Sequence, residues 1–142
     1  MKAAPLIAEQ IYDAPAEKIW LALTDKNEMK QWYFDVDDFE PEVGFRFHFT
    51  GENEGRKFLH ICVVTEAVSD KKISYTWQYE NYTGTSMVSF ELFDEAGKTK
   101  LVLTHTGLET FPQDNPDFAL ANFTAGWNYI TGTSLKEYLE NN

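Results

Sequence analysis

Apolar and polar residues alternate with a period of two along the middle of this chain, which is the pattern of half-buried β-strands. The clearest example is Phe45, Phe47 and Phe49, which are separated by Arg46 and His48. Similar segments follow, joined by short stretches of turn-forming residues. Short turns between successive strands favour an antiparallel meander, so we expect further strands near residues 57–68, 73–80, 88–92 and 101–106.

The segment before this meander combines one strand with two short helices. Residues 5–12 alternate as a strand, and Pro15 then begins a short helix whose buried face holds Ile19, Trp20 and Leu23. A second short helix follows at once. Asp25 with Glu28 forms a capping-box pattern for its start, and we expect it to end near Trp32.

The last part of the chain changes to a helical period. Asn115 can cap a first turn and Pro116 suits the first helical position, so we predict a helix over Pro116 to Glu140. A long amphipathic helix at the end of a strand-rich chain needs a sheet to lie on. The expected fold is therefore α+β, with about six to seven antiparallel strands curved around this helix. Its inner face on a helical wheel holds Leu120, Phe123, Trp127, Ile130, Leu135 and Tyr138.

The centre of that inner face carries small polar residues where a packed helix usually has Leu or Ile. Thr124, Thr131 and Ser134 lie among the aromatic residues, and Gly126 and Gly132 flank them. One interpretation is that the hydroxyls bond back to the preceding turn and the small residues let the helix approach the sheet. The other is that they leave space, so that helix and sheet enclose a cavity. The wheel alone leaves both open.

Length, composition and charge narrow the class of protein. A chain of 142 residues with 43% hydrophobic content suits a single domain over residues 1–142. Its net charge of −11 argues against nucleic acid or an anionic membrane surface as a partner. The single cysteine, Cys62, permits no internal disulfide. No apolar stretch is long enough for a signal or a membrane span, so a cytoplasmic protein is expected.

Four motifs follow one another along nearly the whole chain. They are Ala16-Glu17-Lys18-Ile19-Trp20 with Leu23-Thr24-Asp25 and Trp32; Ile73-Ser74-Tyr75-Thr76-Trp77; Leu101-Val102-Leu103-Thr104-His105-Thr106-Gly107; and Gly126-Trp127 followed by Leu135 and Leu139. In this order they resemble the START-like, or SRPBCC, superfamily, and within it the family homologous to the activators of the Hsp90 chaperone ATPase.

The resemblance implies the helix-grip fold, with two short helices after the first strand and the long C-terminal helix packed on the concave face of the sheet. It implies several functions, because this fold hosts ligand carriers, cyclases and chaperone co-factors. The family name adds a chaperone to the candidate partners. Thr131 and Ser134 depart from the family pattern, which more often has bulkier residues there.

Few residues have the spacing that catalysis or metal binding needs. His105 ends an apolar strand, where it is either a polar contact for a ligand, a general acid or base, or a core histidine bonded to a neighbour. His48 and His60 alternate with apolar residues in strands, and no two histidines have the helical spacing of a metal site. We therefore expect neither a metal nor a cofactor, and an enzyme is the less favoured reading.

The aromatic set is the strongest functional signal, because a mostly apolar pocket with a few polar groups is the usual form of a small-molecule site. We predict a small hydrophobic or aromatic ligand between the last helix and the sheet. A chaperone-stimulating interaction module is the alternative, followed by a cofactor-free enzyme that uses His105. The predicted cavity-lining residues are Trp32, Phe47, Phe49, Trp77, Tyr79, Phe90, His105, Phe123, Trp127, Thr131 and Ser134.

Overall fold

The computed structural model describes residues 4–53 and 55–141. Six strands and two short helices fill the first three quarters of the chain. Their bounds agree with the alternation and capping patterns to within a few residues. The elements are β1 (Leu6–Tyr12), α1 (Ala16–Thr24), α2 (Lys26–Trp32), β2 (Arg46–Asn53), β3 (Arg56–Val68), β4 (Lys72–Tyr79), β5 (Ser86–Glu95) and β6 (Lys98–Thr106).

The C-terminal part begins with two single turns of 3-10 helix, η1 (Leu108–Thr110) and η2 (Pro116–Phe118). The long helix then runs without a break through α3 (Leu120–Tyr129), the π-helical turn η3 (Ile130–Ser134) and α4 (Leu135–Glu140). The Asn115 side chain accepts a hydrogen bond from the Asp117 N–H at 2.9 Å. The predicted cap therefore exists, but it starts the separate turn η2, and the helix proper begins four residues after Pro116.

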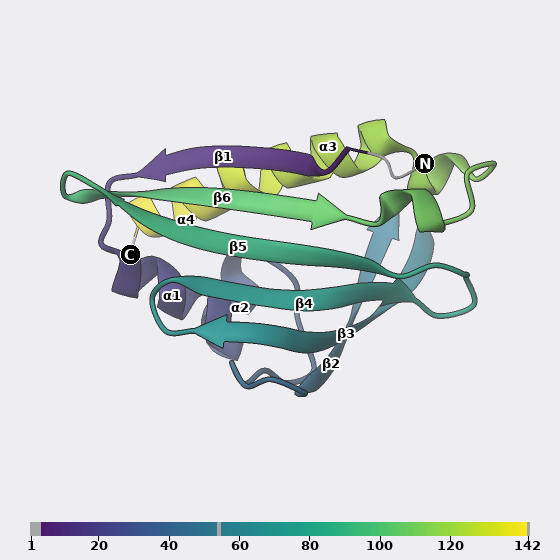
Figure 1. Cartoon of the computed structure of the whole chain (residues 1–142), viewed down its shortest axis with the longest axis horizontal. Coiled ribbons are helices and arrows are strands. Elements are labelled where there is room, and N and C mark those ends of the chain that lie inside the picture. The colour runs from purple at the N-terminus through teal and green to yellow at the C-terminus, as the bar shows by residue number, and fades with distance from the viewer. Residues whose placement is uncertain (1–3, 54, 142) are drawn as a thin grey trace.

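All six strands form one antiparallel sheet in the order β1-β6-β5-β4-β3-β2. The first strand pairs with the last, and the meander then continues to β2 at the opposite edge. The long helix lies behind the sheet in Figure 1, against the face that the strands curve around. This arrangement confirms the predicted α+β helix-grip fold.

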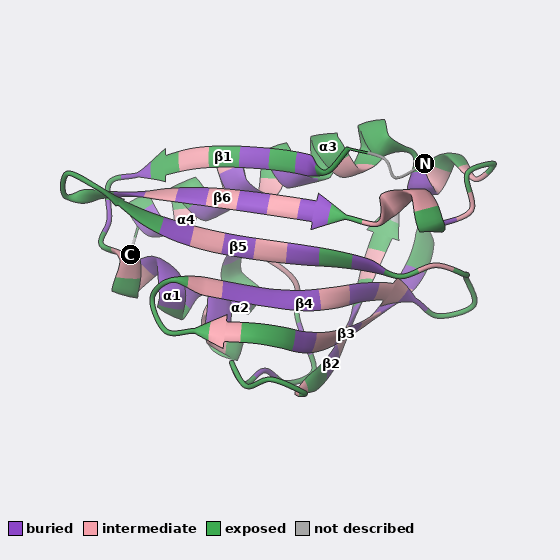
Figure 2. Ribbon diagram, viewed as in Figure 1, coloured by how far each residue is buried: buried purple, intermediate pink, exposed green. Residues whose placement is uncertain are grey.

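The strand register places the predicted aromatic rows on the face that meets the helix. His60 of β3 lies opposite Phe49 of β2 and Tyr79 of β4, and Trp77 lies opposite Ser86 of β5. Buried and less buried positions alternate along the strands as the period-two pattern requires (Figure 2).

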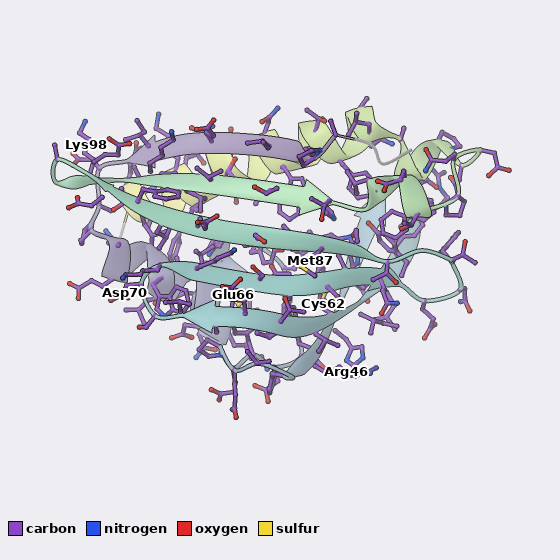
Figure 3. The ribbon with its side chains drawn as sticks, in the orientation of Figure 1. Arg46, Cys62, Glu66, Asp70, Met87 and Lys98 are labelled. Atoms are coloured by element: carbon purple, nitrogen blue, oxygen red, sulfur yellow. The ribbon has the colours of Figure 1, made fainter. Side chains whose placement is uncertain are left out.

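The two ends of the sheet are covered differently. The β3–β4 turn at Asp70 and the β5–β6 turn at Lys98 lie at one end (Figure 3), and α1 and α2 lie near that end (Figure 1). The start of α3, the β4–β5 loop and the η turns lie at the other end. The two short helices therefore do not cover that second end.

The buried face of the long helix differs from the helical wheel. Trp127, Thr131, Leu135 and Leu139 are buried at intervals of four, whereas Leu120, predicted to face inward, is 59% exposed. A regular helix with 3.6 residues per turn rotates positions four apart steadily off one line. The π turn η3 holds more residues per turn and corrects this drift. The uniform wheel was therefore wrong for Leu120, and also for Thr124, which is exposed.

Candidate functional site

A cavity of about 360 Å³ lies between α3 and the end of the sheet formed by β2, β3 and β4. We call it the α3 cavity. Its walls are mainly aromatic, and its rim carries a few polar side chains. The lining residues are Phe34, Gly51, Glu52, Phe58, His60, Trp77, Tyr79, Asp117, Phe118, Asn122, Phe123, Ala125, Gly126, Trp127 and Ile130.

Small residues border this space on both sides. On the helix, Ala125 and Gly126 face the cavity, and a Cβ atom built on Gly126 would meet no atom within 4 Å. On the sheet, Gly51 ends the aromatic row of β2, and a Cβ atom there would lie only 2.8 Å from His60 Cε1. The open volume on the helix side therefore lies at Gly126, five residues before Thr131, whereas Gly51 makes room for the His60 ring.

The aromatic walls are held in place by ring contacts and by one internal hydrogen bond. The Trp77 ring lies 5.3 Å from that of Trp127 and 4.8 Å from that of His60, both nearly edge to face. Trp77 Nε1 donates to the Tyr79 hydroxyl at 2.8 Å. Such tilted pairs are favourable arrangements for aromatic rings, so the walls are preformed.

A buried hydrogen-bond network holds the Trp127 side chain from the side of the sheet. Its Nε1 donates to His105 Nδ1 at 3.0 Å, and on the other side of the ring His105 Nε2 lies 2.8 Å from Ser86 Oγ. Ser86 in turn donates to the Trp77 carbonyl at 3.0 Å. Burial lowers the pKa of His105 to about 3, so the ring is neutral. Both ring nitrogens are occupied, which gives His105 a structural role and leaves no nitrogen free for proton transfer.

Thr131 and Ser134 are bonded to backbone carbonyls and do not line the α3 cavity. Thr131 is fully buried, and its hydroxyl donates to the Trp127 carbonyl at 2.8 Å. The Tyr12 hydroxyl donates to the Thr131 carbonyl at 2.6 Å, which ties the π turn to β1. Ser134 donates to the Trp32 carbonyl. The first of the two interpretations, in which the hydroxyls satisfy backbone groups, therefore describes this segment.

The structure brings only part of the predicted site together. Trp77, Tyr79, Phe123 and Trp127 line the α3 cavity. Trp32 donates to the Ala22 carbonyl at 2.9 Å, away from the cavity. The others that do not line it are buried in the core with His105, and they are Phe47, Phe49 and Phe90.

Several lining residues were missed by reasoning from the sequence. Phe34 follows α2 in a segment without regular structure, and Phe58 and His60 lie near the start of β3. Phe58 and His60 are two residues apart in their strand and so share a face, but the sequence analysis singled out neither as cavity-lining. The sequence offered no signal that this end of β3 would lie beneath the first turns of α3, because that depends on how far the sheet curls.

His60 is the buried polar side chain of the cavity wall. Its ring is stacked on Phe49 with 4.3 Å between centroids, and the residue is 6% exposed. Its Nδ1 lies 3.0 Å from the Phe58 carbonyl oxygen. Loss of hydration lowers the pKa of His60 to about 4, so its ring is neutral near pH 7.

An ion pair stands at the rim of the cavity. Arg56, at the start of β3, donates from Nε to Asp117 Oδ2 at 2.9 Å and from a second nitrogen to Oδ1. This two-pronged contact ties the β2–β3 hairpin to η2. Glu52 is exposed at the same rim.

The described part of the chain holds no cluster of three or more His, Cys, Asp or Glu side chains that could bind a metal ion. Of the helices within residues 4–53 and 55–141, none combines the length and apolar character that crossing a bilayer requires. The α3 cavity is lined mainly by aromatic rings, with the carboxylates of Glu52 and Asp117 among its few polar groups.

A curved antiparallel sheet that grips a long C-terminal helix, with two short helices after the first strand, defines a START-like domain. The family described as Activator of Hsp90 ATPase homolog 1-like protein matches residues 13–140. The chain belongs to this family, as its four motifs indicated. Among curated proteins, no sequence matches this chain.

Solved structures support the same fold. A crystal structure of protein MLL2253 from Mesorhizobium loti is 26% identical with a TM-score of 0.78, and the match covers 97% of this chain and 98% of that one. A solution structure of protein BH1534 from Bacillus halodurans is 22% identical with a TM-score of 0.75, covering 96% and 97%. CalU16 from Micromonospora echinospora is 24% identical with a TM-score of 0.71, covering 94% and 74%. This fold is compatible with ligand binding.

Proposed function

We propose that this protein binds a small hydrophobic or aromatic molecule in the α3 cavity. The observation that carries the proposal is a ring-lined space of about 360 Å³ that small residues leave open between helix and sheet. Pockets for small molecules have volumes of roughly 300–1,000 Å³ and apolar walls with a few polar groups. The α3 cavity lies at the lower end of this range, which suits a ligand of two or three fused rings.

The preformed walls favour binding. Trp77 and Trp127 are held by hydrogen bonds to Tyr79 and His105, so they lose little side-chain freedom when a ligand enters. A planar ligand gains edge and face contacts with these rings in place of water. Both indoles border the cavity, so their fluorescence should report its occupancy.

The test fills the cavity from the helix side. Gly126→Leu places an apolar side chain in the open space, whereas Ala121→Leu adds similar apolar volume on an exposed part of α3 that does not line the cavity. We expect binding of an apolar dye and of fused-ring aromatics, followed by tryptophan fluorescence, to weaken at least tenfold in Gly126→Leu and to remain unchanged in Ala121→Leu. Equal affinity in both variants, or no binding by the wild type below roughly 1 mM, would overturn the proposal.

The family match favours a second candidate, stimulation of a chaperone ATPase by direct contact. A surface interaction does not require an open cavity. If this candidate is right, purified protein should raise the ATPase rate of a cognate Hsp90-type chaperone. The Gly126→Leu variant should raise that rate to the same extent as the wild type. An unchanged ATPase rate across a titration would rule it out.

A further inference from the structure

We propose that His60 selects the ligand of the α3 cavity by accepting a hydrogen bond, so that the preferred ligand is a neutral hydroxylated aromatic molecule whose O–H group points at His60 Nε2. The inference rests on the proposed function and assigns it a ligand class and a specificity-determining residue. Its basis is the arrangement of hydrogen-bonding groups around the His60 ring.

The tautomer of His60 follows from its neighbour. The Phe58 carbonyl oxygen, 3.0 Å from Nδ1, can only accept a hydrogen bond. Nδ1 must therefore carry the proton. A neutral imidazole has a single N–H, so Nε2 presents a bare lone pair.

That lone pair is accessible from the cavity. Every buried side-chain nitrogen and oxygen atom in the described part of the chain has a hydrogen-bond partner. Within that part, the hydrogen bond found at this ring joins Nδ1 to the Phe58 carbonyl, and none is found at Nε2. The Phe49 backbone carbonyl also acts on the ring and raises its pKa, which burial lowers by more. Nε2 must therefore reach accessible space, and His60 lines the α3 cavity. A hydrogen-bond acceptor surrounded by aromatic rings favours ligands that carry a hydrogen-bond donor over ligands that lack one.

The remaining polar groups favour a neutral ligand over an anion. Asp117 is paired with Arg56, and Glu52 adds a further carboxylate at the rim. The chain as a whole carries a net charge of −11. A carboxylate-bearing ligand such as a fatty acid would meet this negative potential on entry, whereas a phenol-type group would not. Inside, the bare Nε2 would repel an anionic oxygen.

The experiment compares two probes that differ only in their donor, 2-naphthol and 2-methoxynaphthalene, by tryptophan fluorescence at pH 7. In the wild type we expect 2-naphthol to bind roughly fivefold to tenfold more tightly, the effect of one hydrogen bond to a buried acceptor. In His60→Phe, which keeps a ring on Phe49 and removes the acceptor, this preference should disappear. The affinity for 2-methoxynaphthalene should change less than twofold, which also shows that the variant is folded.

A second variant keeps the imidazole and moves it. Gly51 has no left-handed backbone angle, so Gly51→Ala changes little beyond placing a methyl group 2.8 Å from His60 Cε1, and the ring must shift. We expect this variant also to lose most of the preference for 2-naphthol. Equal wild-type affinity for both probes would overturn the role of His60 and leave the proposed function standing. Failure of both probes to bind would overturn the proposed function itself.

Discussion

Two buried histidines make the stability of this protein sensitive to acid. The pKa of His60 is lowered to about 4 and that of His105 to about 3, in both cases because burial removes the hydration of the charged form. In the unfolded chain both would titrate near their ordinary pKa of about 6.5. As the pH falls below this value, the unfolded chain takes up protons that the folded chain does not, so folding loses free energy.

We therefore expect the free energy of unfolding to decrease by about 2 kcal/mol per histidine between pH 7 and pH 5. The decrease should continue to about pH 4 for His60 and about pH 3 for His105. Urea melts at each pH measure it. In His60→Phe the decrease between pH 7 and pH 5 should be about half that of the wild type. A variant whose pH profile matches the wild type would show that His60 is hydrated in the folded protein.

At the scale of elements, the long helix combines a well-packed half with a half that overhangs the sheet. From Trp127 to Leu139, residues at intervals of four are buried, and the π turn η3 keeps them in line. Before Trp127 the helix is mostly exposed, with Gly126 bordering open space. The glycine in the overhanging half therefore weakens the helix without serving a close contact, which is consistent with its role in keeping the cavity open.

This difference predicts stability gains of different size when the two helical glycines are replaced by alanine. Gly126→Ala should raise the free energy of unfolding by about 1 kcal/mol, because alanine favours the helix and its methyl group meets no atom. Gly132→Ala should gain less, since its Cβ atom would lie 3.0 Å from Gln10 Nε2 and the residue lies in the π turn. Urea melts of both variants provide the comparison. Destabilisation by Gly126→Ala would mean that α3 is closely packed at this point.

For the molecule as a whole, charge is the dominant surface property. The chain has 23 acidic and 12 basic residues, and their net repulsion opposes the compact state. Salt screens charges at the surface more strongly than buried pairs. The negative field also surrounds the rim of the α3 cavity, so it acts on ligand entry as well as on folding.

We expect the melting temperature at pH 7 to rise by several degrees when NaCl is raised from 20 to 300 mM, because screening relieves this repulsion. The same titration near pH 4.6, where the net charge is close to zero, should be nearly flat. A fall in melting temperature with salt at pH 7 would show instead that ion pairs such as Arg56–Asp117 outweigh the repulsion.

The sequence by itself determined the strands with their inward faces and the two short helices. Period-two alternation located the strands and their inward residues, such as Trp77 and Tyr79, because neighbouring side chains of a strand must point to opposite sides. Local capping by Asp25 located α2, since its side chain accepts from the Asn27 N–H at 2.9 Å. Both signals depend on residues that are close in the chain. The four motifs, in their order along the chain, also indicated the family.

The location of the cavity was decided only by the tertiary structure. A cavity is the volume left over where distant elements meet, and here it depends on Gly51, His60 and Gly126 from β2, β3 and α3. The sequence showed the small residues of the helix. It could not show that neighbouring side chains would pack against Thr131 while the space beside Gly126 would stay open. That outcome depends on the π turn and on how far the sheet curls, because both set which helix positions face the strands. Among the described residues, the same geometry engages both nitrogens of His105 and only Nδ1 of His60.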